Sequence, residues 1–206
     1  MNKKHQLKII AFEGLDKSGK RTQSELLAQE LSERGYNVVH SEFHRYDTPT
    51  GKLIRQFLDG EYKAPQLAIE CIMAADKYAQ LDWFKELEQQ GIDVLILDRY
   101  TLSQLVYAKA QDVDADFVYG ILELLPAPTF EFYLDISVEE SIGRKGQHGE
   151  NDLYERNHAF LQKVQAEYNR YFEINEDAGK TAVIEASRPK LDIHEEILKR
   201  TLQILE

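Results

Sequence analysis

The stretch Gly14-Leu-Asp-Lys-Ser-Gly19-Lys20 decides the fold. It has the spacing G-x-x-x-x-G-K, it follows an apolar run predicted as a strand (residues 7–13), and it opens a predicted helix (residues 19–34). Glycine at both ends permits backbone angles that a side chain would forbid. The backbone N–H groups and the helix N-terminus can then surround anionic oxygens, and Lys20 adds a positive charge over the β and γ phosphates of a nucleotide. We therefore predict a phosphate-binding loop rather than a plain strand-to-helix turn.

The residue after Lys20 departs from this motif. Ser or Thr is expected there as a Mg²⁺ ligand, but the chain has Arg21, and Thr22 comes one residue later. Arginine cannot ligate Mg²⁺, although Mg²⁺ usually keeps several waters and needs few protein ligands. Three outcomes stay open: Thr22 replaces the missing hydroxyl, water replaces it, or the metal site is impaired.

Around the loop, short β-rich runs alternate with longer helical patterns. Further strands are predicted at residues 36–43, 94–97, 130–136 and 181–186, and further helices at 49–58, 65–90, 101–110, 115–124, around 161–171 and at the C-terminus. This alternation predicts an α/β fold of three layers, in which helices cover both faces of a parallel sheet of about five strands. Ligands bind such sheets at the carboxyl ends of the strands. We expect a single domain over residues 1–206.

The composition excludes several classes of protein. The 206 residues include 25 Lys or Arg and 36 Asp or Glu, for a net charge of −11, so a protein that coats nucleic acid or an anionic membrane is not expected. Cys71 is the only cysteine, so neither an intrachain disulfide nor a thiolate zinc site can form. No apolar run approaches the length of a membrane span. We expect a soluble, cytoplasmic protein with no nucleic-acid or membrane partner.

A second signature follows the apolar run at residues 94–97, which ends in Asp98 and Arg99. A carboxylate at that strand end lies beside the phosphate-binding loop and can hold Mg²⁺, usually through water. A guanidinium can bind two phosphate oxygens at once. The plain alternative is a local ion pair, but the presence of the loop favours the functional interpretation.

At this point the chain resembles a known family, the thymidylate (dTMP) kinases, over nearly its whole length. The resemblance rests on Phe12 to Gln23, Phe43-His-Arg-Tyr46, Gly51 to Ile54, Ala75-Asp-Lys77, Asp98 to Gln104 with Tyr107, Leu125-Pro-Ala-Pro128 and Asp152-Leu-Tyr154-Glu155. The chain departs from the family pattern at His44 (usually proline), Lys77 (usually arginine) and Thr129 (often aspartate). The resemblance implies the nucleoside monophosphate kinase fold with a short lid near residues 143–152, and a homodimer. It also implies transfer of the ATP γ-phosphoryl group to dTMP, giving dTDP and ADP, with Mg²⁺.

The resemblance also implies residue roles on the ATP side. The expected ATP-binding residues are Gly14, Asp16, Lys17, Ser18, Gly19, Lys20, Arg21, Thr22, Arg144, Lys145 and Ala186, and the expected metal ligands are Asp98 and Thr22. We expect Lys17, Lys20, Arg99, Asp98 and Arg144 to be catalytic. Lys17 takes the role of an arginine finger, while Arg144 or Lys145 closes over ATP; the plain alternative is that Lys17 is an exposed loop lysine.

On the acceptor side, the expected dTMP-binding residues are Asp16, Phe43, Arg45, Met73, Lys77, Arg99, Ser103, Gln104, Tyr107 and Tyr154. Arg99 grips the acceptor phosphate with Arg45 close by, and Tyr107 fills the space of a ribose 2′-OH. Met73 stands where the family stacks an aromatic ring on thymine, with ordinary helix packing as its alternative. Two further readings stay open: a kinase for dUMP or a modified deoxypyrimidine, or a nucleotide-binding protein without turnover.

Overall fold

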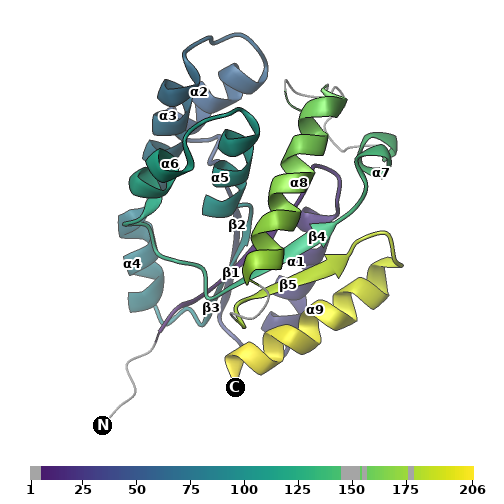
Figure 1. Cartoon of the computed structure of the whole chain (residues 1–206). Helices are drawn as coiled ribbons and strands as arrows, with labels where there is room; N and C mark the ends of the chain where they lie inside the picture. Colours follow the sequence, from purple (N-terminus) through teal and green to yellow (C-terminus); the bar gives the residue numbers. More distant parts are fainter. Residues whose placement is uncertain (1–5, 145–153, 155–156, 176–178) are drawn as a thin grey trace.

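The computed structural model describes residues 6–144, 154, 157–175 and 179–206 (Figure 1). In chain order the elements are β1 (Lys8–Glu13), α1 (Lys20–Glu33), β2 (Val38–Glu42), α2 (Pro49–Leu58), α3 (Gln66–Tyr78), α4 (Leu81–Gln89), β3 (Val94–Asp98), α5 (Thr101–Ala110), α6 (Ala115–Leu122), β4 (Phe130–Asp135), α7 (Val138–Gly143), α8 (His158–Asn175), β5 (Thr181–Glu185) and α9 (Lys190–Leu205). No helix among the described residues is long and apolar enough to cross a membrane.

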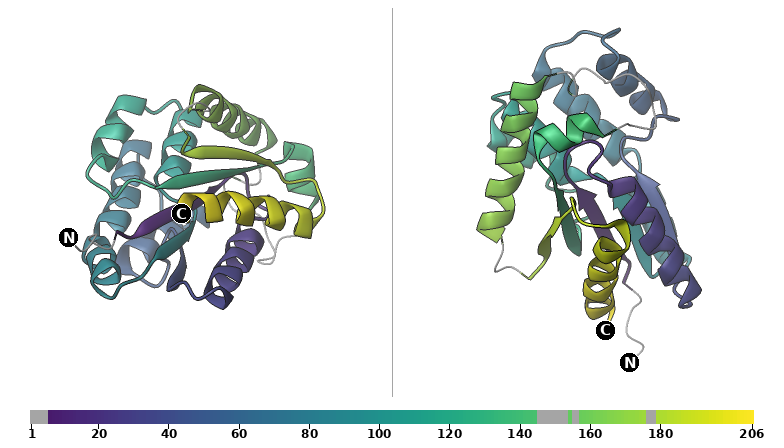
Figure 2. Two further views of the ribbon diagram at one scale, coloured as in Figure 1. Left: turned by 90° about the horizontal axis from the view of Figure 1, so that it is seen from below. Right: turned by 90° about the vertical axis from the view of Figure 1, so that its right-hand side faces the viewer.

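The five strands form one parallel sheet in the order β2-β3-β1-β4-β5. Helices α1 and α9 pack on one face, where Leu27 and Ile197 are buried, and α4, α5, α6 and α8 pack on the other (Figure 2). Because both faces are covered, β1, β3 and β4 are buried along almost their whole length. The predicted α/β fold of three layers is therefore confirmed.

The sheet topology places the phosphate-binding loop next to the Asp98 signature. Strand β1 lies at the centre of the sheet, and its end pairs with the end of β3, where Phe12 is opposite Asp98. The backbone N–H of Arg99 then donates to the carbonyl of Phe12 at 2.9 Å. The two motifs, more than seventy residues apart in the sequence, therefore begin from one edge of the sheet.

The prediction of one helix over residues 65–90 is wrong, because the chain turns at Ala79 and Gln80 between α3 and α4. Helix α3 buries Met73 in a small cluster with α2, whereas α4 buries Phe84 and Leu87 in the main core. Helix α3 also contributes one side chain to the main core, so the chain changes direction between a helix that faces both clusters and one whose buried side chains lie in the main core. Helix α7 was not predicted.

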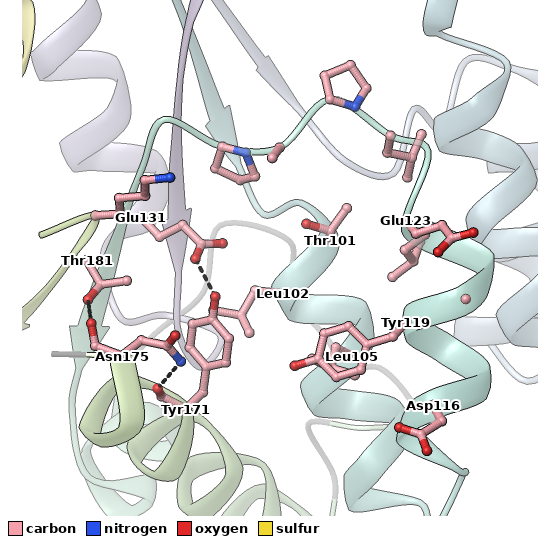
Figure 3. A pocket seen from close by; sticks show the side chains of 17 residues that line it. Thr101, Leu102, Leu105, Asp116, Tyr119, Glu123, Glu131, Tyr171, Asn175 and Thr181 are labelled. Carbon is pink, nitrogen blue, oxygen red and sulfur yellow. Dashed lines mark hydrogen bonds between the residues drawn. The ribbon is translucent and has the colours of Figure 1, made fainter. Parts of the chain in front are cut away.

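A cavity of about 590 Å³ lies between α5, α6 and α8 (Figure 3). The side chain of Glu131 on β4 points into it and accepts a hydrogen bond from the Tyr171 hydroxyl at 2.9 Å. None of the residues that line this cavity belongs to the site predicted from the sequence. That site must be sought at the carboxyl ends of the strands.

Candidate active site

The phosphate-binding loop has the backbone that its glycines predict. Gly14, Lys17 and Gly19 have φ angles of 140°, 62° and 100°, in the left-handed half of φ space. A Cβ on Gly14 would lie 2.6 Å from the carbonyl oxygen of Leu134, so no side chain fits there. The loop therefore passes tightly over the end of β4 and leads directly into α1.

The loop keeps two polar side chains inside it. The Lys20 ammonium is buried and donates to the carbonyl of Leu15 at 2.8 Å. Burial, together with the positive charge of Arg99, lowers the pKa of Lys20. The Ser18 hydroxyl is also buried, and within the described part of the chain it has no hydrogen-bond partner. A buried donor without a partner, beside a buried cation, fits a loop that receives anionic oxygens.

Asp16 and Arg99 form an ion pair beside the loop, with Arg99 Nη2 2.6 Å from Asp16 Oδ1. Burial would raise the pKa of Asp16, but the charges of Arg99 and Lys20 outweigh it and hold this pKa at about 2. Tyr107 joins the pair: its hydroxyl is 3.5 Å from Asp16 Oδ2, and the Arg99 guanidinium lies 5.4 Å from the centre of its ring. Three of the predicted site residues are therefore in direct contact.

Ser103 holds Arg99 in place from the side opposite Asp16. Its hydroxyl accepts from Arg99 Nη1 at 3.0 Å and also bonds Glu13, and Tyr168 lies 2.9 Å away. Glu13 is fully buried and accepts from the backbone N–H of Tyr100 at 2.9 Å. Burial raises the pKa of Glu13. The contacts of Glu13 therefore support a structural role at the end of β1.

The loop after β2 carries Phe43 and Arg45. Phe43 is buried against Tyr100, with ring centres 5.4 Å apart. The Arg45 guanidinium lies 5.3 Å from the ring centre of Trp83, and its Nε is 3.6 Å from Asp47 Oδ1. Trp83, which the sequence did not single out, therefore supports the side chain predicted to lie near the acceptor phosphate.

Helix α3 carries the two residues predicted to select the base. Lys77 is buried, and its ammonium donates to Gln104 Oε1 at 2.9 Å and to the carbonyl of Met73 at 3.4 Å. Gln104 Nε2 in turn donates to the backbone and the carboxylate of Glu70, at 2.8 and 3.0 Å, which fixes the orientation of its amide. Burial lowers the pKa of Lys77 to about 8, against the opposing charges of Asp76 and Glu70.

Met73 and Tyr154 pack between α2, α3 and α5. Met73 belongs to an apolar cluster with Ile54 and Phe57, so its alternative as a packing residue has direct support. Tyr154 contacts the ring of Tyr107, with centres 5.5 Å apart. Its hydroxyl accepts from Gln111 Nε2 at 3.2 Å. A contact of Met73 with the base and of Tyr154 with the dTMP substrate stays a prediction.

On the ATP side, Arg144 connects three segments. It donates to the carbonyl of Lys17 at 3.1 Å and to the carbonyl of Ala186 at 2.8 Å, and it pairs with Glu140 at 2.5 Å. Helix α7 adds a further contact, because Ser141 donates to the carbonyl of Asp16 at 2.8 Å. Lys145 and the predicted lid from that residue to 152 lie outside the described residues.

The structure gives limited support to the two predicted metal ligands, Asp98 and Thr22. Asp98 is half-buried at the end of β3, and its carboxylate accepts no hydrogen bond from the residues that the structure describes. Arg21 points toward the end of β2, with Nη2 3.0 Å from Glu42 Oε2, and Thr22 is exposed on α1. Over the described ranges, no group of three or more His, Cys, Asp or Glu side chains could hold a metal ion. The carboxylate of Asp98 is a hard oxygen donor of the kind that suits Mg²⁺.

The family model of the thymidylate kinases matches residues 12–197. This chain belongs to the thymidylate kinase family. A probable thymidylate kinase from Methanococcus aeolicus is 32% identical over 201 residues, covering 95% of this chain and 96% of that protein. The thymidylate kinase of Plasmodium falciparum is 31% identical, covering 96% of this chain and 90% of that protein. The structure of thymidylate kinase from Candida albicans has the same fold, with a TM-score of 0.82 and 24% identity, over 97% of this chain and 93% of that one.

Membership of the thymidylate kinase family identifies the chain as a nucleoside monophosphate kinase that uses ATP as the phosphoryl donor. It also agrees with the geometry, because the cations Lys20 and Arg99 lie at one edge of the sheet, coupled electrostatically to each other and to Asp98. Two polyanionic nucleotides can react only where positive groups offset their mutual repulsion.

Proposed function

We propose that the chain transfers the γ-phosphoryl group of ATP to the 5′-phosphate of dTMP at the carboxyl ends of β1 and β3. The observation that carries the proposal is the Asp16–Arg99 pair next to the buried Lys20. Lys20 and the loop N–H groups hold the ATP phosphates, and the Arg99 guanidinium binds two oxygens of the acceptor phosphate. The kinase then works by alignment and charge stabilisation, because the transferred group needs little covalent help.

Asp16 has a double role in this proposal. Its carboxylate keeps Arg99 in place before the acceptor arrives, and Ser103 holds the other side of the same guanidinium. A guanidinium that is already oriented loses less entropy when it binds phosphate. The remaining Asp16 oxygen, near Tyr107, can accept a hydrogen bond from the sugar of the acceptor.

Lys77 is proposed to donate to a carbonyl oxygen of the base. An ammonium has three hydrogens, and the described residues accept two of them, through Gln104 and Met73. The third suits a carbonyl, which both thymine and uracil have. Thymine preference then depends on packing around the methyl group, and Met73 is a candidate for that contact.

Mg²⁺ fits this site through Asp98, whose carboxylate would hold the ion directly or through water, with nucleotide phosphates supplying further oxygens. When bound, the ion neutralises phosphate charge during transfer. Thr22 stays a proposed alternative ligand, and Lys17, Arg144 and Lys145 stay proposed ATP contacts. We also propose that the protein acts in the cytoplasm as a homodimer without nucleic-acid or membrane partners.

An ADP-release assay with saturating Mg·ATP tests the proposal across dTMP, dUMP, dCMP, dGMP and dAMP. We expect dTMP to give the highest kcat/KM, dUMP to follow, and ADP release to stop when Mg²⁺ is removed. The Arg99→Met chain should lose at least ~100-fold in kcat/KM for dTMP, because it lacks the guanidinium that binds the acceptor phosphate. A higher kcat/KM for another monophosphate would replace dTMP as the substrate. Binding of both nucleotides without ADP release would indicate a protein without turnover.

A further inference from the structure

The carboxylate of Asp76 on α3 lies at the centre of the loop that joins β2 to α2. It is fully buried, and four groups that can donate a hydrogen bond surround it. Oδ1 lies 2.8 Å from the Thr50 hydroxyl and 2.9 Å from the Thr48 hydroxyl, and Oδ2 lies 3.1 Å from both His44 Nδ1 and the backbone N–H of Arg45. Each carboxylate oxygen therefore has two partners, and all four come from the loop and the first turn of α2.

The protonation of this cluster follows from its surroundings. Burial would raise the pKa of Asp76, but the hydrogen bonds from His44, Thr50 and the Arg45 backbone hold it at about 2. Burial and the charge of Lys77 lower the pKa of His44 to about 4. At neutral pH the carboxylate is thus ionised and the imidazole is neutral. The imidazole proton must lie on Nδ1, because only a donor can face the carboxylate.

The same loop fixes the backbone of Arg45 from both sides. Its N–H donates to Asp76, and its carbonyl accepts from the Thr48 backbone N–H at 3.0 Å. The Thr48 hydroxyl, 2.8 Å from that carbonyl and 2.9 Å from Asp76, can give its single proton to either acceptor, and it accepts from Gly51 N at 3.0 Å. A Cβ on Gly51 would lie 1.8 Å from the Arg45 carbonyl oxygen, so only glycine permits this close turn.

We propose that Asp76 is the positioning residue of the acceptor site: it ties the segment from His44 to Gly51 onto α3 and thereby fixes where Arg45 reaches the acceptor phosphate. The next residue on α3 is Lys77, which faces the base in the proposed function. The buried carboxylate of Asp76 therefore holds the segment that carries Arg45 against α3, the helix that carries Lys77. The inference rests on the proposed function, because it needs Arg45 to contact the acceptor.

The test is steady-state kinetics of the Asp76→Ala and Asp76→Asn chains, with dTMP and ATP varied separately. Asp76→Ala leaves the Arg45 N–H and the His44 ring without an acceptor, so the loop must shift. Since a displacement of about 1 Å at a positioning group can cost about 100-fold, we expect kcat/KM for dTMP to fall at least ~10-fold. The KM for ATP should stay within about twofold, because Asp76 makes no hydrogen bond to the phosphate-binding loop within the described part of the chain.

Asp76→Asn should restore most of the lost kcat/KM. Its amide oxygen can still accept from His44 and Arg45, while its NH₂ group faces two threonine hydroxyls, which can turn and accept. A merely structural role would instead lower the melting temperature of both chains while kcat and KM per folded molecule stayed unchanged. That result would overturn the proposal.

If Asp76→Ala does not fold, Thr50→Val and His44→Ala decide the question, because each removes one donor and keeps the carboxylate. Both should raise the KM for dTMP by a smaller factor, and normal constants in both would overturn the proposal. Asp59→Asn is the matched control, since Asp59 holds Arg55 at the exposed end of α2 and should leave both KM values unchanged. Failure of the unsubstituted chain to phosphorylate dTMP would refute the proposed function instead.

Discussion

Arg99 shows how much of the site can be predicted residue by residue. The motifs identify Asp98, Arg99 and Lys20 from sequence alone, because a glycine-rich loop of this spacing between a strand and a helix is typical of phosphate binding. The family resemblance names Ser103, but the contacts through which Ser103 holds Arg99, with Glu13 and Tyr168 behind it, could not be found in that way. Glu13, Ser103 and Tyr168 meet from β1, α5 and α8, and no local pattern marks side chains that are 65 to 155 positions apart.

Lys17 and Arg144 compete for the role of the catalytic cation, and the position of Lys17 within the phosphate-binding loop favours Lys17. The Arg144 guanidinium already has three acceptors, two backbone carbonyls and Glu140. Lys17 lies within the phosphate-binding loop itself, where its φ of 62° is set by the loop. Lys17→Met should therefore lower kcat by about 10³-fold, the lower end for cationic fingers, with a smaller change in ATP affinity.

Single-turnover rates and ATP binding of Lys17→Met, beside Arg144→Met, separate the two roles. Lys199→Met, on the exposed side of α9, is the control and should behave as the unsubstituted chain. Full turnover in Lys17→Met combined with its loss in Arg144→Met would assign the catalytic cation to Arg144.

At the scale of elements, the strands and most helices follow from local signals, but the break between α3 and α4 does not. Helix α2 starts at Pro49 after the capping Thr48, as the sequence indicates. The turn between α3 and α4 has no glycine or proline to mark it, because it results from tertiary packing. Helix α7 did carry a signal: Ser137 caps it and Glu140 comes three residues later.

The buried Glu131 on β4 should make the stability of the protein depend on pH. Burial and the neighbouring Glu13 raise the pKa of Glu131 to about 7, against the hydrogen bond from Tyr171, whereas an unfolded chain has the ordinary value near 4.5. Between these values the folded state binds the proton and the unfolded state does not, so stability falls as pH rises. Between about pH 4.5 and 8, the titration of Glu131 should lower the free energy of unfolding by about 3 kcal/mol.

Urea unfolding of the unsubstituted chain and of Glu131→Gln, measured at intervals from about pH 5 to 8, checks this prediction. The glutamine chain lacks the titration, so its free energy of unfolding should fall less over that range. Glu88→Gln, an exposed change on α4, should keep the full pH dependence. Parallel curves for the unsubstituted and Glu131→Gln chains would show that Glu131 titrates normally in the folded protein.

For the whole molecule, the distribution of charged and apolar side chains bears on both the active site and the assembly. With a net charge of −11, and with Lys17, Lys20, Arg45, Lys77, Arg99 and Arg144 placed around one edge of the sheet, the rest of the surface must carry the acidic excess. Helices α3 and α6, which contact each other, instead expose Leu67, Tyr119 and the following Leu124 (Figure 1). Exposed apolar side chains on neighbouring helices favour association with a second copy.

Light scattering after size exclusion tests that association. We expect the unsubstituted chain to have the mass of a dimer and the doubly substituted Leu67→Asp, Tyr119→Asp chain to have the mass of a monomer, because buried like charges would face each other across a two-fold axis. Leu191→Asp changes an equally exposed leucine on α9, on the opposite face of the sheet, and should remain a dimer. A monomeric unsubstituted chain would refute the homodimer, and a dimeric double variant would move the interface away from α3 and α6.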